Sequence, residues 1–329
     1  MSRADTSQAG TSQADTRTGA TGATDAASGA DATGGADVPA GPAAGPDAAV
    51  RRPGALWTLG LFRSELTVTF RRWRSLALLA VLAAVPVLVG IAIRIETGDD
   101  GSGGGGGPAF ISQVTNNGLF LVFTSLAATL PFFLPMTVGV IAGDAVAGEA
   151  NAGTLRYLLV APAGRTRLLL AKFATTLVFC LAGTLVVALS ALITGALLFP
   201  VGDVTLLSGT TIPFAEGLLR ALAVAVVVAA SLIGLAAIGL FISTLTNSGI
   251  AAMAATVGLL ITVQILNTIP QLDGIHPYLF PQYWLSFADV LRDPVYWDEI
   301  LKNLGLQALY AAVFGSAAWA RFTSRDITV

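Results

Sequence analysis

The sequence predicts an all-α membrane protein with about six transmembrane helices, preceded by an amphipathic interfacial helix and a disordered N-terminal tail. Of the 329 residues, 54% are hydrophobic and only 12% are charged, and the mean hydropathy is +0.74, whereas soluble domains carry about 25% charged residues. Several apolar runs are each long enough, at about 20 residues, to cross a bilayer as a helix. The net charge of −2 also lacks the basic balance that nucleic-acid binding requires.

Residues 1–50 form the predicted tail. They are almost wholly Ala, Gly, Thr, Ser, Asp, Gln and Pro, so they bury too little apolar surface to offset the entropy of ordering the chain. They also lack the apolar core of a signal peptide, and we expect the first span to direct the chain to the membrane. Residues 51–329 are predicted to form one helical membrane domain.

Residues 55–73 predict an amphipathic helix that lies on the membrane surface. Their large apolar residues recur at helical spacing, and these are Leu59, Phe62, Leu66, Phe70 and Trp73. A basic cluster closes the segment with Arg71, Arg72 and Arg74. The cluster would suit anionic headgroups or would form the positive flank of the first span, and both interpretations place it in the cytoplasm.

The predicted spans follow this helix, and they cover about residues 76–95, 118–141, 168–199, 217–242, 250–269 and 300–320. If the N-terminus is cytoplasmic, the basic residues outside the cytoplasmic segments are only Arg94, Arg220, Arg292 and Lys302. Orientation follows the Lys and Arg bias, so both termini are expected in the cytoplasm. The preference for Arg over Lys and the Ala-rich tail are typical of high-GC bacterial genes, which indicates a bacterial cytoplasmic membrane.

The predicted spans carry no charge near their middle. Charges inside a membrane span are usually kept for proton relay or ion coupling, so their absence argues against an ion-coupled secondary carrier. The carrier is nevertheless the main alternative to the function inferred below. An intramembrane enzyme is still less favoured, because His276 is the only histidine and Cys180 the only cysteine, and neither a G-x-S-x-G elbow nor a Walker A lysine occurs. We therefore expect no catalytic residue, metal or cofactor in this chain.

The most informative segment lies between the second and third predicted spans. Asn151 to Gly153 interrupts one helix, Thr154 can cap a second, and Pro162 with Gly164 ends it. Leu155, Leu158 and Leu159 form an apolar face on this short helix, and the face is flanked by Arg156, Arg165 and Arg167. It is either a loop helix packed beneath its own bundle or a knob that fits a groove on a soluble partner.

This segment resembles the signature of ABC-2-type permeases, the membrane subunits of ATP-driven exporters. The matching residues are an acid, a Gly-Thr-Leu, a Leu-Leu, a proline, an arginine and a lysine, namely Glu149, Gly153, Thr154, Leu155, Leu158, Leu159, Pro162, Arg165 and Lys172. The resemblance covers about residues 55–325 and includes the six-span layout with an N-terminal interfacial helix. It departs from the family at Asn151, where a second acid is often found.

The resemblance implies a function and its partners. The segment would be the coupling helix that docks on an ABC ATPase, and its site residues would be Glu149, Gly153, Thr154, Leu155, Arg156, Leu158, Leu159, Pro162 and Arg165. Two copies of this chain, a homodimer of permeases in membrane lipid, would pair with two ATPase subunits. Those subunits would bind ATP and Mg, and this chain would perform no chemistry.

The transport path is marked only by modestly polar residues inside predicted spans, which are Ser125, Thr129, Thr256, Gln264 and Asn267. A path without charges would suit a hydrophobic or amphipathic substrate, although Ser and Thr in spans usually bond to their own helix.

Two further features of the sequence allow two interpretations each. Gly139-x-x-x-Gly143 fits packing within the chain or a dimer seam, and the aromatic segment 270–299 fits re-entrant helices or an interfacial belt.

Overall fold

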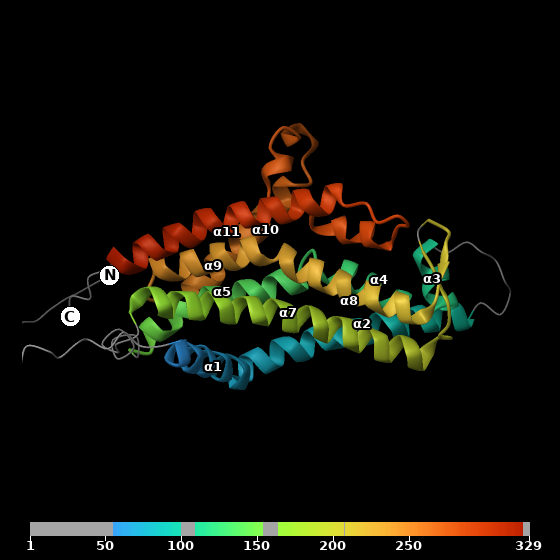
Figure 1. Cartoon of the computed structure of the whole chain (residues 1–329), viewed down its shortest axis with the longest axis horizontal. Helices are drawn as coiled ribbons and strands as arrows, with labels where there is room; N and C mark the ends of the chain where they lie inside the picture. Colours follow the sequence, from blue (N-terminus) through green and yellow to red (C-terminus); the bar gives the residue numbers. More distant parts are fainter. Residues whose placement is uncertain (1–54, 100–108, 154–163, 207, 325–329) are drawn as a thin grey trace, which may run out of the picture. The chain divides into compact units, whose positions relative to one another are not determined.

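The computed structural model describes residues 55–99, 109–153, 164–206 and 208–324, and these residues are mostly α-helical (Figure 1). The first helices are α1 (Ala55–Arg71), α2 (Trp73–Asp99), α3 (Ala109–Asn116), α4 (Phe120–Thr129), α5 (Phe133–Asn151) and α7 (Arg165–Leu198). The predicted tail, residues 1–50, lies outside the described residues. Thr154, Leu155, Arg156, Leu158, Leu159 and Pro162 of the predicted coupling helix also lie outside them.

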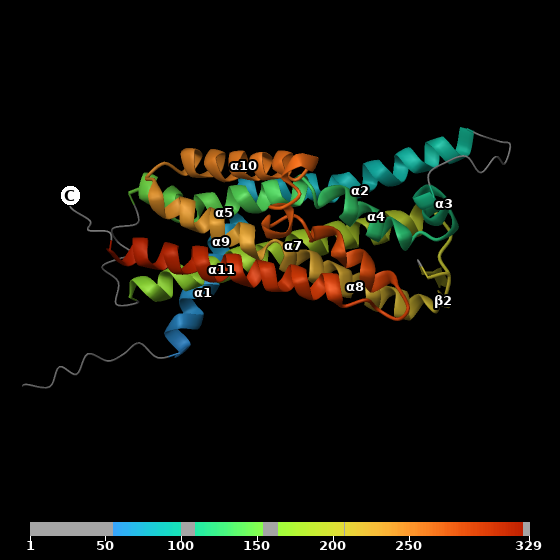
Figure 2. The same cartoon turned by 90° about the horizontal axis from the view of Figure 1, so that it is seen from above.

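The second half of the chain begins with a small antiparallel ribbon of β1 (Val204–Thr205) and β2 (Thr211–Ile212), in which Val204 pairs with Ile212. The elements that follow are α8 (Phe214–Ser231), α9 (Ile233–Leu245), α10 (Gly249–Leu266), the 3-10 helices η1 (Pro270–Leu272), η2 (His276–Tyr278) and η3 (Trp284–Leu291), and α11 (Asp298–Ser324). The long helices run alongside one another, with α9 against α11, α10 against α5 and α2 against α7 (Figure 2).

Five helical segments of the described chain are long and apolar enough to cross a membrane. They are Trp73–Thr97, Phe133–Asn151, Arg165–Leu198, Phe214–Leu245 and Gly249–Leu266. The prediction of an all-α, multi-pass membrane protein is therefore confirmed, with five candidate spans among the described residues. The sixth predicted span, residues 300–320, falls within α11, which has 27 residues but is not among those five, and it stays a prediction. Its first turns carry Asp298, Glu299 and Lys302, which make it less apolar.

The predicted second span, residues 118–141, is divided into two helices. α4 ends at Thr129 and α5 begins at Phe133, because Pro131 lacks the N–H that a continuous helix would need. The Gln264 side chain of α10 donates a hydrogen bond from Nε2 to the Pro131 carbonyl oxygen at 2.6 Å, which satisfies a polar group at the break. α5 then continues to Asn151, well past the predicted end of the span.

Replacing Gln264 with leucine is expected to lower the free energy of unfolding by about 1 kcal/mol, because the Pro131 carbonyl loses its hydrogen bond. Reversible unfolding in mixed micelles would measure the change. The matched control is Thr262→Val on the same helix, since the Thr262 hydroxyl is exposed and bonds only to the Gly258 carbonyl oxygen at 2.9 Å. Equal stability of Q264L and T262V would contradict the assigned role.

A second break separates α8 from α9 at Leu232, inside the predicted span 217–242. Two fully buried polar side chains of α11 hold this break. Asn303 Nδ2 donates to Ser231 Oγ at 2.6 Å, and Gln307 Oε1 accepts from the Gly234 backbone N–H at 3.1 Å. Gln307 Nε2 donates to the Phe280 carbonyl oxygen at 2.8 Å, so the same network attaches the aromatic segment to α11.

The aromatic segment before α11 combines buried and exposed residues. Phe280 and Trp284 are buried, and their rings lie 5.6 Å apart. Tyr278, Tyr296 and Trp297 are exposed. The segment forms the 3-10 helices η1 to η3 rather than α-helices, and only its exposed aromatic residues match the pattern of an interfacial belt.

The small-residue motif of α5 packs within the chain. A Cβ at Gly143 would lie 2.9 Å from the Met253 Cα of α10, and a Cβ at Gly139 would lie 3.3 Å from Thr256 Cγ2 of the same helix. The two glycines therefore let α5 and α10 approach closely. Of the two interpretations of this motif, the structure supports packing within the chain.

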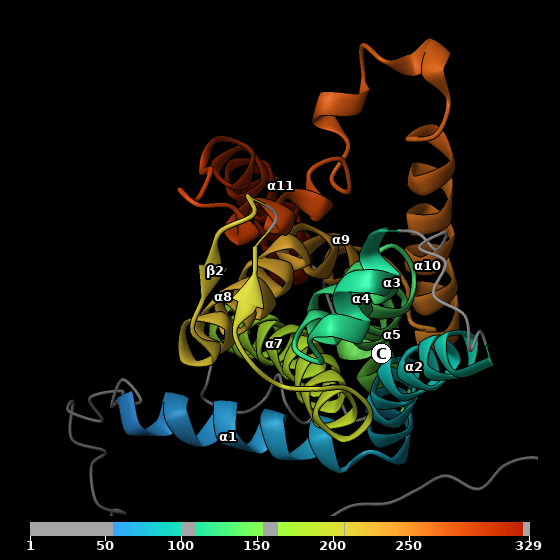
Figure 3. The ribbon, with the colours of Figure 1, turned by 90° about the vertical axis from the view of Figure 1, so that its right-hand side faces the viewer.

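The predicted interfacial helix is present as α1, and it lies across the direction of the long helices (Figure 3). Phe62, Leu66 and Phe70 of its apolar face are half-buried, whereas Leu59 and Trp73 are exposed. The rings of Phe70 and Phe179 lie 5.8 Å apart, which attaches α1 to α7. Part of the predicted membrane-facing surface therefore packs against the chain itself.

Candidate functional site

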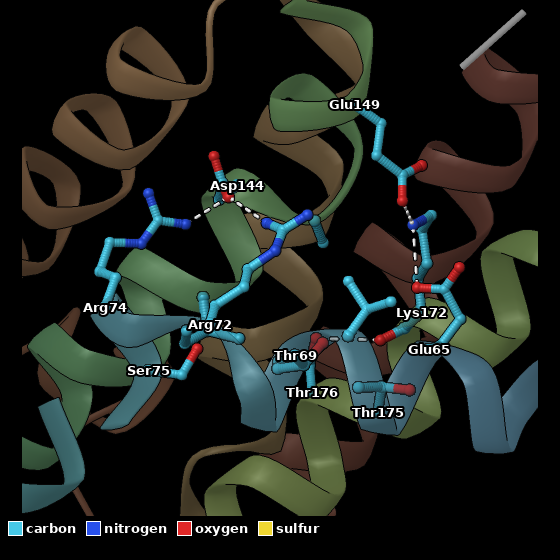
Figure 4. A pocket seen from close by; sticks show the side chains of 13 residues that line it. Glu65, Thr69, Arg72, Arg74, Ser75, Asp144, Glu149, Lys172, Thr175 and Thr176 are labelled. Atoms are coloured by element: carbon cyan, nitrogen blue, oxygen red, sulfur yellow. Dashed lines mark hydrogen bonds and ion pairs between the residues drawn. The ribbon is translucent and has the colours of Figure 1, made fainter. Parts of the chain in front are cut away.

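Charged side chains from distant parts of the sequence gather where α1, α2, α5 and α7 meet (Figure 4). This ion-pair cluster consists of Glu65, Arg72, Arg74, Asp144, Glu149 and Lys172. Its three basic and three acidic groups balance one another in charge. The cluster lies at the end of α5 and the start of α7, the two helices that flank the predicted docking segment in the sequence.

Lys172 of α7 joins two carboxylates from two other helices. Its Nζ lies 3.1 Å from Glu65 Oε2 on α1 and 2.5 Å from Glu149 Oε1 on α5. The Lys172 side chain is 3% exposed and each glutamate is 12% exposed. A buried ammonium group is stable only when it is paired and hydrogen-bonded, so this triad holds α1, α5 and α7 in one arrangement.

Asp144 is the centre of the second half of the cluster. Its Oδ2 accepts a hydrogen bond from Arg72 Nη1 at 2.9 Å and another from Arg74 Nη2. Its Oδ1 lies so close to the backbone of Gly148 and Gly249 that a Cβ at either position would be 2.5 Å away. Gly249 is the first residue of α10, and the N-terminus of a helix favours a negative charge.

The helical geometry of α5 lets it serve both halves of the cluster. Asp144 and Glu149 are five positions apart, which at 3.6 residues per turn turns their side chains about 140° from each other. Asp144 therefore faces the junction of α1 and α2, whereas Glu149 faces α7. Any rotation of the end of α5 would disturb both sets of ion pairs.

The cluster surrounds a small polar cavity with about 30 Å³ of water-accessible space, enough for about two waters. Two buried hydroxyls line it, Ser75 Oγ and Thr175 Oγ1, and neither has a hydrogen-bond partner among the described residues. Nowhere in the described ranges do three or more His, Cys, Asp or Glu residues gather as metal ligands would.

Of the predicted docking residues, two lie at the end of α5, one lies at the start of α7 and six lie outside the described residues. Glu149 belongs to the ion-pair cluster, and Gly153 follows the end of α5 with φ +68°, the left-handed conformation in which glycine commonly ends a helix. Arg165 begins α7, and its Nη1 donates to the Thr323 carbonyl oxygen of α11 at 2.9 Å. The six remaining docking residues, between Gly153 and Arg165, lie outside the described residues.

The residues proposed for the transport path bond mostly within the helical bundle in the described part of the chain. Ser125, Thr129 and Thr256 are fully buried. Thr129 bonds to the Ser125 carbonyl oxygen and Thr256 to the Ala252 carbonyl oxygen, both within their own helices. Gln264 holds the break at Pro131, and Asn267 ends α10. None of the five lines the polar cavity described above.

No role was predicted for Asp144 or Glu65, and Arg72 and Arg74 were predicted to meet anionic headgroups or to flank the first span. The second span was predicted to end near residue 141, and Asp144 was placed beyond it, in the short cytoplasmic helix that Asn151 to Gly153 interrupts. The signal that could have found it is the run of small and apolar residues from Ala142 to Ala150, which continues the helix around Asp144 and Glu149. Charges inside such a helix require partners.

A family model described as "Protein of unknown function (DUF2705)" matches residues 107–328, which is more than half of the chain. The matched range includes Asp144, Glu149 and Lys172 of the ion-pair cluster, but not Glu65, Arg72 or Arg74. A comparison with curated proteins gave no match. The chain therefore belongs to the DUF2705 family.

Proposed function

We propose that this chain is the membrane-spanning permease subunit of an ABC exporter in a bacterial cytoplasmic membrane, with both termini in the cytoplasm. It would couple ATP hydrolysis by a separate ATPase subunit to export of a substrate. The observation that carries the proposal is the Glu65–Lys172–Glu149 triad, which joins α1 to α5 and α7, the helices that precede and follow the predicted docking segment in the sequence. Glu149 and Lys172 are also two residues of the permease motif.

In this mechanism an ATPase subunit pushes on residues 154–162, and the push reaches the end of α5 and the start of α7 together. Lys172 transfers the movement to α1 through Glu65, and Asp144 transfers it to the start of α2 through Arg74. Two permeases and two ATPases would form the working unit. ATP and Mg would bind to the ATPases, and this chain would transmit and gate.

The pairing of Glu149 changes the role that we propose for it. Its carboxylate is directed to Lys172 inside the bundle, so we assign it to transmission rather than to direct contact with the ATPase. Direct docking is left to Thr154, Leu155, Leu158 and Leu159, with Arg156 and Arg165 at the rim.

An ion-coupled secondary carrier remains the second candidate, because one observation favours it. Asp144 and Glu149 lie within a helix that could span a membrane, Phe133–Asn151, and buried acids in such helices are typical of ion or proton coupling. Transport in ATP-free vesicles under an ion gradient would support the carrier and contradict the exporter.

If this chain is an exporter subunit, an ATPase of about 30 kDa, the mass of a domain of 200 to 300 residues, should co-purify with it.

Leu158→Asp is expected to abolish transport while membrane insertion and ATP hydrolysis continue, because a charge on the apolar face of the docking helix prevents its fit. Leu158→Met is the control and should retain coupling. Full transport by L158D would exclude the assigned docking face.

A further inference from the structure

The outward face of α1 carries positive charge and no acid. Arg63, Thr67 and Arg71 are four positions apart, so they form one stripe along the helix, and all three are exposed. We call these three residues the basic stripe. The only acid of α1 is Glu65, and its side chain is turned inward to Lys172 and is 12% exposed. The positive charge of the basic stripe is therefore not offset by its own helix.

The structure divides the basic residues at the junction of α1 and α2. Arg72 and Arg74 both donate hydrogen bonds to Asp144, and they belong to the ion-pair cluster, which is neutral as a whole. Arg71 takes no part in that cluster. Neither Arg63 nor Arg71 has an ion-pair partner in the part of the chain that the structure describes. The partner of the stripe is therefore water or an anion from outside the chain.

The bilayer lies directly beside the stripe. α1 runs across the long helices at the edge of the bundle (Figure 3), and the apolar span that follows it begins at Trp73. Only 22% of the apolar stretch of this span is buried, less than in the other four candidate spans, so lipid surrounds most of it. Trp73 is 83% exposed and Leu76 is 48% exposed. An exposed tryptophan at the end of a span marks the level of the lipid headgroups.

We propose that the basic stripe binds the headgroups of anionic phospholipids in the leaflet beside α1. Guanidinium groups donate paired hydrogen bonds to phosphate oxygens, and an anionic membrane surface attracts basic residues that lie near it. In a zwitterionic headgroup the attached cation offsets this attraction. Exposed Leu59 and Val68 flank the stripe and can enter the boundary between headgroups and acyl chains. Because Glu65 joins α1 to Lys172, bound lipid would also hold the ion-pair cluster at a fixed depth in the membrane.

The test uses the full chain in phosphatidylcholine vesicles that contain a smaller fraction of phosphatidylglycerol, an anionic lipid. Bromine on acyl chains quenches the fluorescence of nearby tryptophan. In one set of vesicles only the phosphatidylglycerol is brominated, and in a matched set an equal fraction of the phosphatidylcholine is. The signal of Trp73 is the difference between the unchanged chain and Trp73→Phe. We expect phosphatidylglycerol to be enriched about fivefold over phosphatidylcholine at Trp73, as the attraction of about one arginine predicts.

A second tryptophan gives the internal control. Trp297 is 58% exposed and is followed by the acids Asp298 and Glu299, so anionic lipid should not gather around it. Its signal is obtained in the same way with Trp297→Phe, and the two brominated lipids should quench it equally. Equal quenching of Trp73 by the two lipids would overturn the proposal.

Variants assign the enrichment to the stripe. Arg63→Gln combined with Arg71→Gln removes both charges without touching the ion-pair cluster, and it should abolish the enrichment at Trp73. Arg63→Glu combined with Arg71→Glu should lower phosphatidylglycerol at Trp73 below its bulk fraction. The matched control is Arg94→Gln, which changes an exposed arginine near the other end of α2 and should leave the Trp73 signal unchanged. An enrichment that survives in R63Q/R71Q would contradict the assignment.

Salt provides an independent criterion. At about 1 M salt the screening length falls to about 3 Å, so most of the enrichment at Trp73 should be lost. An enrichment that persists there would arise from the acyl chains and would overturn the electrostatic site. None of these measurements needs an ATPase or a transported substrate, so failure of the exporter proposal would not be confused with failure of this one.

Discussion

Replacing Lys172 with methionine is expected to lower the free energy of unfolding by about 4 kcal/mol, the cost of removing one partner from a buried ion pair. Methionine fills similar space, but it leaves Glu65 and Glu149, each 12% exposed, without their shared ammonium group. The two carboxylates would then repel each other in a site that water reaches poorly. Reversible unfolding of the purified chain in mixed micelles measures the loss.

Two controls separate this effect from a general loss of charge. Lys302→Met removes a lysine that pairs with Asp298 and Glu299 on the exposed side of α11, and the unfolding midpoint should stay unchanged because exposed ion pairs contribute little. The triple variant K172M/E65Q/E149Q should recover most of the stability, because no buried charge is left unpaired. A single K172M variant as stable as K302M would contradict the burial argument.

The triple variant also tests the proposed transmission. It keeps the chain folded but lacks the ionic link between α5, α7 and α1. If the Lys172 triad carries movement from the docking segment, the variant should bind the ATPase and permit ATP hydrolysis while transport falls. A triple variant with full transport would restrict the triad to a structural role.

The helices that could be predicted from sequence are those with a local signal. The span near residues 76–95 falls within α2, and those near 168–199 and 250–269 end one and three residues beyond α7 and α10, since about 20 apolar residues in a row specify a helix by themselves. The break at Leu232 has no such signal, because neither proline nor glycine stands at that position. It is held by Asn303 and Gln307, which are more than 70 positions away in the sequence.

Only part of the ion-pair cluster could be predicted from the sequence, for the same reason. The motif drew attention to Glu149 and Lys172, but nothing in their spacing shows that the two side chains meet. Glu65 joins Lys172 from 107 positions away, and that contact depends on α1 packing across α7. Sequence patterns show which charges need partners, whereas the packing of helices decides which partners they find.

The second large effect is expected at Gly195, where the backbone of α7 touches the backbone of the turn that precedes α4. A Cβ at Gly195 of α7 would overlap the Gly118 carbonyl oxygen, and a Cβ at Gly118 would overlap the Gly195 carbonyl oxygen. The Gly118 N–H also donates to the Pro200 carbonyl oxygen at 2.9 Å. The entry to α4 is therefore fixed against the end of α7 by backbone contacts that any side chain would separate.

Gly195→Ala is expected to lower the free energy of unfolding by about 3 kcal/mol, because backbone, unlike a flexible side chain, cannot move aside for the added methyl group. The matched control is Gly258→Ala in α10, where no atom other than the adjacent backbone of its own helix lies within 4 Å of the new Cβ. There the change should raise stability by about 0.5 to 1 kcal/mol, because alanine favours helix more than glycine does. The same substitution thus has opposite signs at two helical positions. If both variants were stabilised, α4 and α7 would not cross as closely as these glycines require.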